Sequence, residues 1–303
     1  ILHKAVMIYN CPNSPCNSST KNKLVIKDGR YKRACDSRKI QRFRCKVCGK
    51  KFSRATFSFE KYQKKRRVNH RIYRMLCDRS SMRSISRELN INYKTVARKV
   101  QYLAEKSRRR QRRFLKKLEK SQVQNMQFDD LITLEHTKMK PLSVSLAVDK
   151  KRRFVLGAEV SRIPAFGHLA KKSKKKYGYR ENHHERGLNR LMEKIYRTID
   201  RDALIESDEH NTYPKIVAKY FSSQEHKRYK GGRSCVAGQG ELKRQHFDPL
   251  FTLNHTCAMF RAHINRLIRK SWCSTKRVDM LQAHIDIFIC FYNLDYLGGL
   301  SPT

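Results

Sequence analysis

Acidic residues are scarce in this sequence. Its 303 residues include 26 Asp and Glu against 69 Lys and Arg, which gives a formal charge of +43. Because so large a charge repels itself in a compact state, we expect a polyanionic partner, with nucleic acid ahead of an anionic membrane surface. The hydrophobic content of 39% is enough for modest cores, and the length predicts two to three folded units. A wholly disordered basic tail is therefore excluded.

Long apolar runs are also missing. No stretch approaches the roughly 18 consecutive apolar residues of a spanning helix, so we expect a soluble, intracellular protein with no membrane partner. Residues 1–9 are too short and too polar-flanked for a signal peptide. The chain opens with Ile rather than Met, so we expect a few residues to precede this numbering. No heptad repeat is long enough to predict a coiled coil, and no Ser-His or Cys-His catalytic pair is apparent.

Four of the ten cysteines fall in two close pairs near the beginning of the chain. Cys11 and Cys16 form the first pair, and Cys45 and Cys48 form the second, followed by Gly49. Two short knuckles that each present two thiolates can close a tetrahedral site around one structural zinc ion. We therefore predict a zinc ribbon over residues 1–60, with unrelated buried thiols as the alternative. Cys35 has no close partner and is expected to be a free thiol.

Helical periodicity follows the cysteine pairs. From about residue 61 to residue 115, apolar residues recur at the three-to-four spacing of an amphipathic helix. Residues 89–92 are typical of a tight turn, with Asn92 as the N-cap of a second helix. The pattern predicts a helix-turn-helix over 61–105, with an unspecialised helical hairpin as the alternative. In that arrangement the residues facing a DNA major groove are Tyr93, Lys94, Thr95 and Arg98.

A strongly basic run continues from residue 106 to residue 117, and we predict a basic helix or linker over 106–123. Charge runs are usually solvated faces. Because this run follows a candidate DNA-reading unit, phosphate contacts from Arg109 and Arg110 are the favoured interpretation.

The pattern changes after residue 124 to short alternating segments. Three strands are expected at 126–135, 143–149 and 153–160, followed by a basic insertion near 165–187 and a helix at 188–199. A short apolar strand at 203–208, a helix near 214–220 and a long helical region at 256–292 complete the chain. This is the element order of an α/β RNase H-like nuclease core, which we assign to 124–303. The predicted fold is multidomain: a zinc ribbon, an all-α helix-turn-helix and this α/β catalytic domain.

Two aspartates occupy informative strand positions. Asp129 lies in the first predicted strand and Asp208 ends the fourth, so adjacent strands can bring both to one sheet edge. Phosphodiester cleavage is helped by two divalent cations, and Mg²⁺ prefers carboxylate oxygens with open water positions. We predict Asp129 and Asp208 as catalytic Mg²⁺ ligands, with Mn²⁺ as a possible substitute. Asp130 alternates to the opposite face, and a turn or cap role is the alternative for each Asp.

A third ligand is expected on a helix beside that edge, but residues 253–261 contain no carboxylate. If a helix starts there, Asn254, Ala258 and Arg261 share one face, so Asn254 can lie over the metals while Arg261 approaches phosphate. His255 is the alternative ligand, and a helix-end histidine with no catalytic role is equally compatible with the sequence. Asp248 and Glu241 lie upstream in a predicted loop.

Together these features resemble the InsA–InsB type of bacterial insertion-sequence transposase over nearly the whole chain. The resemblance is carried by the Cys11–Cys48 segment, the helix-turn-helix around 85–100, Phe128-Asp129-Asp130, Ser207-Asp208 with Tyr213, and residues 261–276. In that family a zinc ribbon and helix-turn-helix read terminal inverted repeats, and an RNase H-like domain with a DDE triad cuts and joins DNA. The resemblance places the family's two aspartates at Asp129 and Asp208. It places the family's glutamate at Asn254 and a following arginine at Arg261.

The resemblance implies a metal-dependent DNA transposase with structural Zn²⁺ and catalytic Mg²⁺. Its implied partner is double-stranded DNA, both element ends and target, bound by a homodimer or larger assembly in the bacterial cytoplasm at the nucleoid. Three explanations of Asn254 stay open: ligation through its amide oxygen, replacement by His255, or a substitution that traps or inactivates the enzyme. A non-catalytic DNA-binding regulator is the alternative function. An RNA-binding basic protein would explain the charge and the ribbon but not the acids that end strands.

Further basic residues are assigned to DNA more coarsely. In the insertion, Lys174 and Lys175 with Tyr177 and Tyr179 can follow flanking or target DNA, with a mobile solvated loop as the alternative. His184 of the insertion is expected at the surface. On the terminal helix, Arg266 and Lys270 would continue a phosphate-binding face. Trp272, the single tryptophan, is expected to be a packing residue.

Overall fold

The structure, a computed structural model, describes residues 10–16, 24–34, 36–59, 61, 63–230, 248–268 and 271–299. The chain separates into two compact units, Ile1–His70 and Arg71–Thr303, which we describe one at a time. Among the described residues, no helix has the length and apolar character needed to cross a bilayer.

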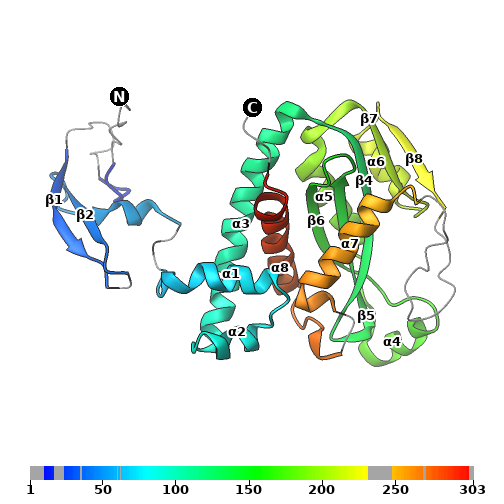
Figure 1. The fold of residues 1–303 in the computed structure, drawn as a ribbon, viewed down its shortest axis with the longest axis horizontal. Helices are drawn as coiled ribbons and strands as arrows, with labels where there is room; N and C mark the ends of the chain where they lie inside the picture. Colours follow the sequence, from blue (N-terminus) through cyan, green and yellow to red (C-terminus); the bar gives the residue numbers. More distant parts are fainter. Residues whose placement is uncertain are drawn as a thin grey trace. The chain divides into compact units, whose positions relative to one another are not determined.

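The first unit is a small antiparallel sheet of three strands (Figure 1). Its strands are β1 (Val25–Lys32), β2 (Lys39–Cys45) and β3 (Lys51–Ser53), in the order β1-β2-β3. The buried ring of Phe52 lies 5.9 Å from that of the half-buried Phe43 and 5.6 Å from that of the exposed Phe57, measured between ring centroids. Because so small a core buries little apolar surface, the unit is of the size that usually needs a metal or disulfide for stability.

The second unit begins with three helices, α1 (Asn69–Cys77), α2 (Met82–Glu88) and α3 (Tyr93–Ser121). The side chain of Ser81 caps α2 by accepting a hydrogen bond from the Ser84 amide at 3.1 Å. Asn92 caps α3 in the same way, accepting from the Lys94 amide at 2.8 Å, as the sequence predicted. Two capped helices joined by a turn are therefore present, as both the helix-turn-helix and the helical-hairpin interpretations expect.

Of the two alternatives predicted for 106–123, a basic helix or a linker, the structure has the helix as far as Ser121. It runs without interruption for 29 residues, from the predicted DNA-reading turn to Ser121. Its second half buries Phe114, Leu115 and Leu118 in the main hydrophobic cluster of the unit. The linker alternative is wrong because the apolar residues of this basic run recur at helical spacing between the arginines and lysines, and such a stripe packs against a core.

The main sheet has five strands in the order β6-β5-β4-β7-β8. Its members are β4 (Val123–Glu135), β5 (Thr137–Asp149), β6 (Val155–Arg162), β7 (Ile199–Asp208) and β8 (Glu225–Tyr229). Strands β4, β5 and β6 are antiparallel neighbours, whereas β7 and β8 run parallel to β4. The four expected strands are present, and β8 was not predicted because its sequence, Glu-His-Lys-Arg-Tyr, has no apolar alternation.

Helices cover both faces and one edge of this sheet (Figure 1). On the face of Phe128 lie α5 (His184–Ile195) and α6 (Tyr213–Tyr220), while α7 (Phe251–His263) packs on the opposite face of β4 and β5. The edge of β6 is covered by α3 and by α8 (Val278–Phe291). Side chains satisfy backbone groups of this edge: Gln282 accepts from the Val160 amide and donates to the Ala158 carbonyl. Asn293 accepts from the Val155 amide and donates to the Val155 carbonyl. An exposed strand edge is thereby removed.

Two further expectations need correction. The long terminal helix expected over 256–292 is two helices, because α7 ends at His263 and α8 begins only at Val278. The basic insertion near 165–187 contains an ordered helix, α4 (Leu169–Tyr177), which packs against β5. The mobile-loop alternative for the insertion is therefore wrong for these residues.

Candidate functional site

The four predicted thiolates come together in the first unit. Cys45 ends β2, and the turn before β3 closes through the Gly49 amide, which donates to the Cys45 carbonyl at 3.0 Å with a positive φ of 69° at Gly49. Cys11 and Cys16 flank a second turn, in which the Cys16 amide donates to Asn13. The two knuckles place all four sulfur atoms within 4.8 Å of one another.

The sulfur geometry fits a zinc ion. The Cys11 and Cys48 sulfurs are 3.5 Å apart, and the Cys16 and Cys45 sulfurs are 3.7 Å apart. Zn–S bonds of about 2.3 Å in a tetrahedron separate sulfur atoms by about 3.8 Å. Desolvation raises the pKa of the Cys11 thiol to about 11, so metal binding must displace its proton. These four residues could hold one zinc ion, whereas Cys35 lies outside the described residues.

The register between β4 and β7 sets the position of the two predicted aspartates. Gln127 pairs with Glu206, so Asp129 and Asp208, each two residues further along, point to the same side of adjacent strands. Burial and, next, the negative charge of Asp208 raise the pKa of Asp129 to about 7. The negative charge of Asp208 is therefore close enough to oppose the ionisation of Asp129, which is the condition that a cation relieves.

The phenol of Tyr213 ties the two neighbouring aspartates of β4 together. This buried tyrosine begins α6, and its hydroxyl lies 3.2 Å from Asp129 Oδ1 and 2.8 Å from Asp130 Oδ2. Burial raises the pKa of Tyr213 strongly, and the surrounding carboxylates raise it further, so the hydroxyl stays protonated and can donate. Tyr213 thus restrains the orientation of the Asp129 carboxyl.

Asp130 has a different environment on the α5 side of the sheet. Its Oδ1 accepts hydrogen bonds from Ser143 at 2.5 Å and from Ser145 at 2.6 Å, and its Oδ2 forms an ion pair with His184. Burial alone would raise the pKa of Asp130, but His184 and the two hydroxyls outweigh it and hold the pKa below its ordinary range. The expectation that His184 lies at the surface is wrong, because its side chain is buried against Asp130.

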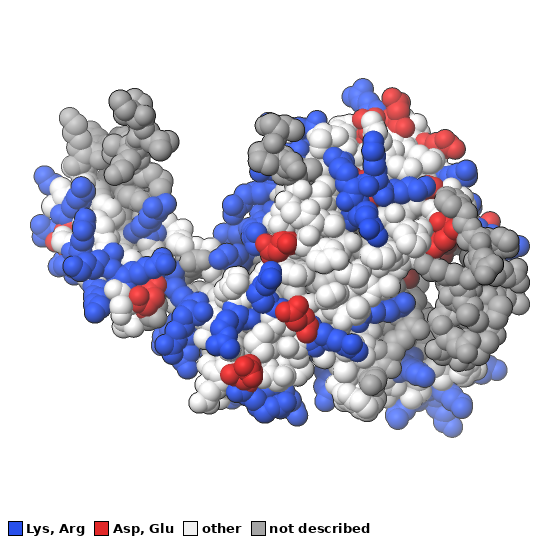
Figure 2. All heavy atoms as spheres, in the orientation of Figure 1, with Lys and Arg blue, Asp and Glu red and all other residues white. Residues whose placement is uncertain are grey.

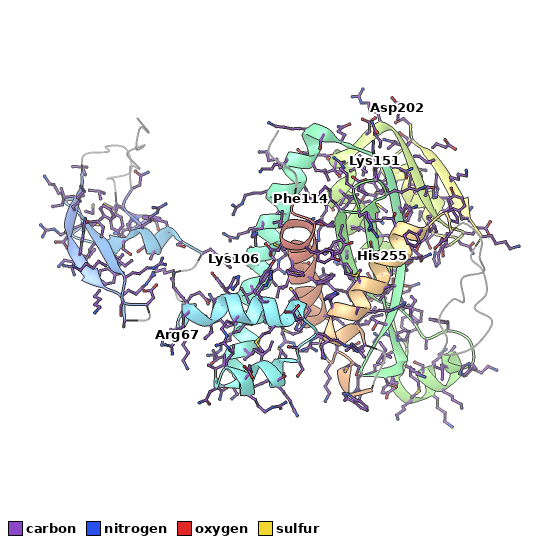
Figure 3. All side chains as sticks on the ribbon, viewed as in Figure 1. Arg67, Lys106, Phe114, Lys151, Asp202 and His255 are labelled. Atoms are coloured by element: carbon purple, nitrogen blue, oxygen red, sulfur yellow. The ribbon has the colours of Figure 1, made fainter. Side chains whose placement is uncertain are left out.

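The two candidate third ligands on α7 have other partners. The Asn254 side-chain amide donates to Asp248 Oδ2 at 2.9 Å, and His255 Nδ1 lies 3.2 Å from the Arg153 guanidinium. His255 is labelled on α7 in Figure 3. Among the described residues, only the four cysteines form a group of three or more His, Cys, Asp or Glu side chains able to hold one ion.

The carboxylates of Asp129 and Asp208 are nevertheless compatible with Mg²⁺ binding. Mg²⁺ is usually held by one or two carboxylates, with water and substrate phosphate completing its shell. Asp129 and Asp208 supply two such carboxylates, and the negative charge of Asp208 adds to the effect of burial in raising the pKa of Asp129. The described residues offer these two carboxylates and no third one that joins them in a group able to hold one ion.

A buried polar network that the sequence analysis missed attaches α7 to the sheet. Gln127 accepts a hydrogen bond from the Leu253 amide at 3.2 Å and donates to the Pro249 carbonyl at 2.7 Å. It also donates to Glu206, whose buried carboxylate is paired with Lys150 at 2.8 Å. This network sets the height of α7, and of Asn254 on it, above the sheet. The only sequence signal was an acid within the apolar strand at 203–208.

The residues predicted to contact DNA fall into distinct environments. Tyr93, Lys94 and Arg98 are exposed at the start of α3, and Thr95 is half-buried beside them. Lys174 and Lys175 are exposed on α4.

The other predicted DNA contacts are less available. Arg109 pairs with Glu105 at 2.9 Å and Arg110 with Asp295 at 3.6 Å, while Arg261 is half-buried near the end of α7. Arg266 turns inward toward Thr275 and His284, and burial lowers the pKa of its guanidinium. The predicted phosphate-binding face at Arg266 is therefore wrong, and Lys270 lies outside the described residues. Trp272, expected to pack, is 81% exposed.

No protein-family model matches this chain, and no curated protein matches it at a significant level of similarity.

Proposed function

We propose that this chain is a DNA transposase that binds the terminal inverted repeats of an insertion sequence and carries out metal-dependent strand cleavage and strand transfer. The observation that carries the proposal is the pair Asp129 and Asp208, side by side on adjacent parallel strands in a protein of charge +43. Acids are few in this chain, and two of them lie together and partly buried. Such a pair favours the binding of a cation. The strand order, with three antiparallel strands followed by two parallel ones, supports an RNase H-like core.

Each part of the chain has a role in this proposal. The zinc-binding unit and the exposed first turn of α3 would hold element ends, since Tyr93, Lys94 and Arg98 project from a capped helix start. Asp129 and Asp208 would hold Mg²⁺, which supplies Lewis-acid activation of a nucleophile and of the leaving oxygen. Tyr213 would keep the Asp129 carboxyl oriented through its hydroxyl. As two element ends are joined in one event, a homodimer or larger assembly is part of the proposal.

Strand cleavage and joining test the proposal directly. Oligonucleotides copied from the DNA that flanks the coding region are incubated with protein and Mg²⁺, and cleaved and joined strands are resolved on denaturing gels. We expect Asp208→Asn to abolish both products while DNA binding is retained. The matched control is Asp202→Asn, which makes the same change at an exposed position of the same strand (Figure 3) and should leave cleavage unchanged.

A second candidate function, a DNA-binding regulator without catalysis, is favoured by one observation. Asn254 stands where the resembled family has its glutamate, and its amide is engaged with Asp248. The variant Asn254→Glu separates the two functions. Joining by the natural sequence supports the transposase, and joining only by Asn254→Glu indicates a trapped or decayed enzyme. Binding without joining by either protein supports the regulator.

A further inference from the structure

The structure distinguishes two basic helical segments that look alike in sequence, the arginine-rich half of α3 and the lysine-rich helix α4. In α3 several arginines lie beside acids of the fold, and three of them share Glu105. Arg108 pairs with Asp286 at 2.8 Å, Arg109 with Glu105 at 2.9 Å, and Arg112 also lies near Glu105 at 3.6 Å. Much of that charge is therefore structural and is not available to a ligand.

The lysines of α4 have no such partners. All five, Lys171, Lys172, Lys174, Lys175 and Lys176, are exposed, and no ion pair involves any of them within the described part of the chain. They repel one another, because Lys171 and Lys175 are four residues apart on one helix face, as are Lys172 and Lys176. Figure 2 shows Lys and Arg atoms where Figure 1 places α4. Within the described residues, no ion pair compensates this concentration of charge.

Helix α4 is nevertheless held firmly in place. Its single buried residue, Ser173, donates a hydrogen bond from Oγ to the Met139 carbonyl of β5 at 2.7 Å. One turn later, the Tyr177 ring lies 4.2 Å from Lys140 Nζ, measured to the ring centroid, and 5.6 Å from Lys176 Nζ. Ser173 and Tyr177 thus face the strand, which directs Lys171 and Lys175 outward. A solvated charge run would not need this docking.

Strand β5, against which α4 packs, also pairs with the strand that carries Asp129. Asp129 pairs with Leu146 of β5, and Met139 lies seven residues before Leu146 on the same strand. At about 3.4 Å per residue, α4 is displaced from Asp129 by about 24 Å along β5. Since the rise of duplex DNA is about 3.4 Å per base pair, this displacement corresponds to about seven base pairs.

We propose that α4 and the adjacent end of β5 form a docking surface for the phosphate backbone of duplex DNA, about seven base pairs from the site at Asp129 and Asp208. The proposal rests on the proposed function for the choice of DNA over other polyanions. Lys171, Lys172 and Lys175 make the phosphate contacts, and Tyr177 fixes Lys140 beside them. Without base-reading groups on a lysine helix, this contact is independent of sequence, which suits DNA outside the inverted repeat.

The salt dependence of binding tests the surface. Binding of the full chain to a fluorescein-labelled 40-base-pair duplex is followed by anisotropy from about 50 to 300 mM KCl. The variant Lys171→Gln/Lys172→Gln/Lys175→Gln is compared with Lys116→Gln/Lys117→Gln/Lys120→Gln, which removes the same charge from exposed positions of α3. We expect the α4 variant to lower the slope of log K against log salt by about 2.7, with at least tenfold weaker binding near 100 mM. The control should lower the slope by less than 1.

Equal slopes for the two triple variants, or an unchanged slope for the α4 variant, would overturn the proposal. A second measurement uses the unaltered protein, so it does not depend on a variant that folds. Lysines are acetylated with and without duplex DNA and quantified by mass spectrometry. Protection of Lys171, Lys172 and Lys175, but not of Lys116, Lys117 and Lys120, is the expected result. Equal acetylation of the α4 lysines in both conditions contradicts the proposal.

The experiments distinguish failure of the transposase proposal from failure of the docking-surface proposal. If the unaltered protein does not cleave DNA but its α4 lysines are protected by the duplex, the transposase proposal fails and the docking surface stands. If cleavage occurs without α4 protection, the docking surface fails alone. Duplex RNA of the same length serves as a competitor. If RNA displaces the DNA at a concentration below that of the DNA itself, the choice of DNA is overturned.

Discussion

At the residue scale, neighbouring acids in this chain have opposite electrostatic roles. Asp130 is stabilised as an anion by His184, Ser143 and Ser145, whereas Asp129 is pushed toward its neutral form by burial and by Asp208. The difference arises from alternation along β4, which directs the two side chains to different partners. Asp130 is therefore already satisfied inside the protein, and Asp129 is the carboxyl that gains from an added cation.

The titration of Asp129 predicts how stability depends on pH. Its pKa rises from 3.8 to about 7 on folding, so the native state holds a proton that the unfolded state releases. The resulting stabilisation is complete below pH 4 and is lost as the pH rises to about 7, with a slope of up to about 1.4 kcal/mol per pH unit. Asp129→Asn should remove this slope from denaturant-derived free energies of unfolding between pH 4 and 7, whereas Asp202→Asn should keep it. Parallel pH profiles for the two variants would refute this.

The cysteine cluster predicts a metal requirement. Cys45→Ser removes one buried ligand, so we expect less than one zinc per chain by plasma mass spectrometry and loss of the strand structure in the first unit. Cys273→Ser, a change at a half-buried cysteine outside the cluster, is the control and should retain one zinc. Zinc affinity should fall as the pH is lowered, because the thiols must release protons to bind. Full zinc occupancy in Cys45→Ser would count against the site.

At the element scale, α3 connects the candidate DNA-reading turn to the core of the second unit. Its 29 residues carry Tyr93 at one end and Leu118 near the other. At about 1.5 Å per residue, these two positions are separated by about 38 Å along one continuous helix. Helix α3 packs along α8, and apolar residues of its second half are buried in the core. The turn at the start of α3 is therefore joined to the core by a packed helix.

Two substitutions in α3 test whether its second half is a core helix or a linker. Leu118 is fully buried, so Leu118→Ala should lower the free energy of unfolding by about 2–5 kcal/mol. Its exposed neighbour Lys117 should tolerate Lys117→Ala within about 0.5 kcal/mol. Both values come from urea denaturation followed by far-ultraviolet circular dichroism. Similar small effects at the two positions would indicate that this half of α3 is not part of the core.

At the scale of the whole molecule, the net charge of +43 opposes the compact state. Some of this charge is offset inside the fold by ion pairs such as Arg108–Asp286 and Lys150–Glu206, but most of it is not, since acids are outnumbered. A bound polyanion relieves the repulsion and also binds the folded state selectively.

This predicts opposite responses to salt with and without DNA. For the free protein, raising NaCl from about 50 to 300 mM should raise the melting temperature by screening the repulsion. A saturating 40-base-pair duplex should raise it further at 50 mM NaCl, and this increment should shrink at 300 mM as binding weakens. Differential scanning fluorimetry measures both effects. A DNA increment that is unchanged at high salt would argue against electrostatic binding.

The sequence by itself determined the features that depend on local chemistry and short spacing. The cysteine pairs, the Asn92 cap and the four strands could be predicted because each is encoded in a few consecutive residues. The predictions that were wrong share one cause. The linker at 106–123, the surface position of His184 and the outward position of Arg266 were predicted from residue type, without knowledge of what packs against each.

Only the tertiary structure decided which charges are already paired, because their partners are distant along the chain. Arg108 meets Asp286, Asp130 meets His184, and Gln127 meets Leu253, and none of these pairs can be inferred from spacing. The same holds for α4: within the described part of the chain no ion pair involves its lysines, whereas Arg108, Arg109 and Arg112 of α3 each lie beside an acid. Local sequence selects which groups are charged, and the fold selects which of those charges stay available for a ligand.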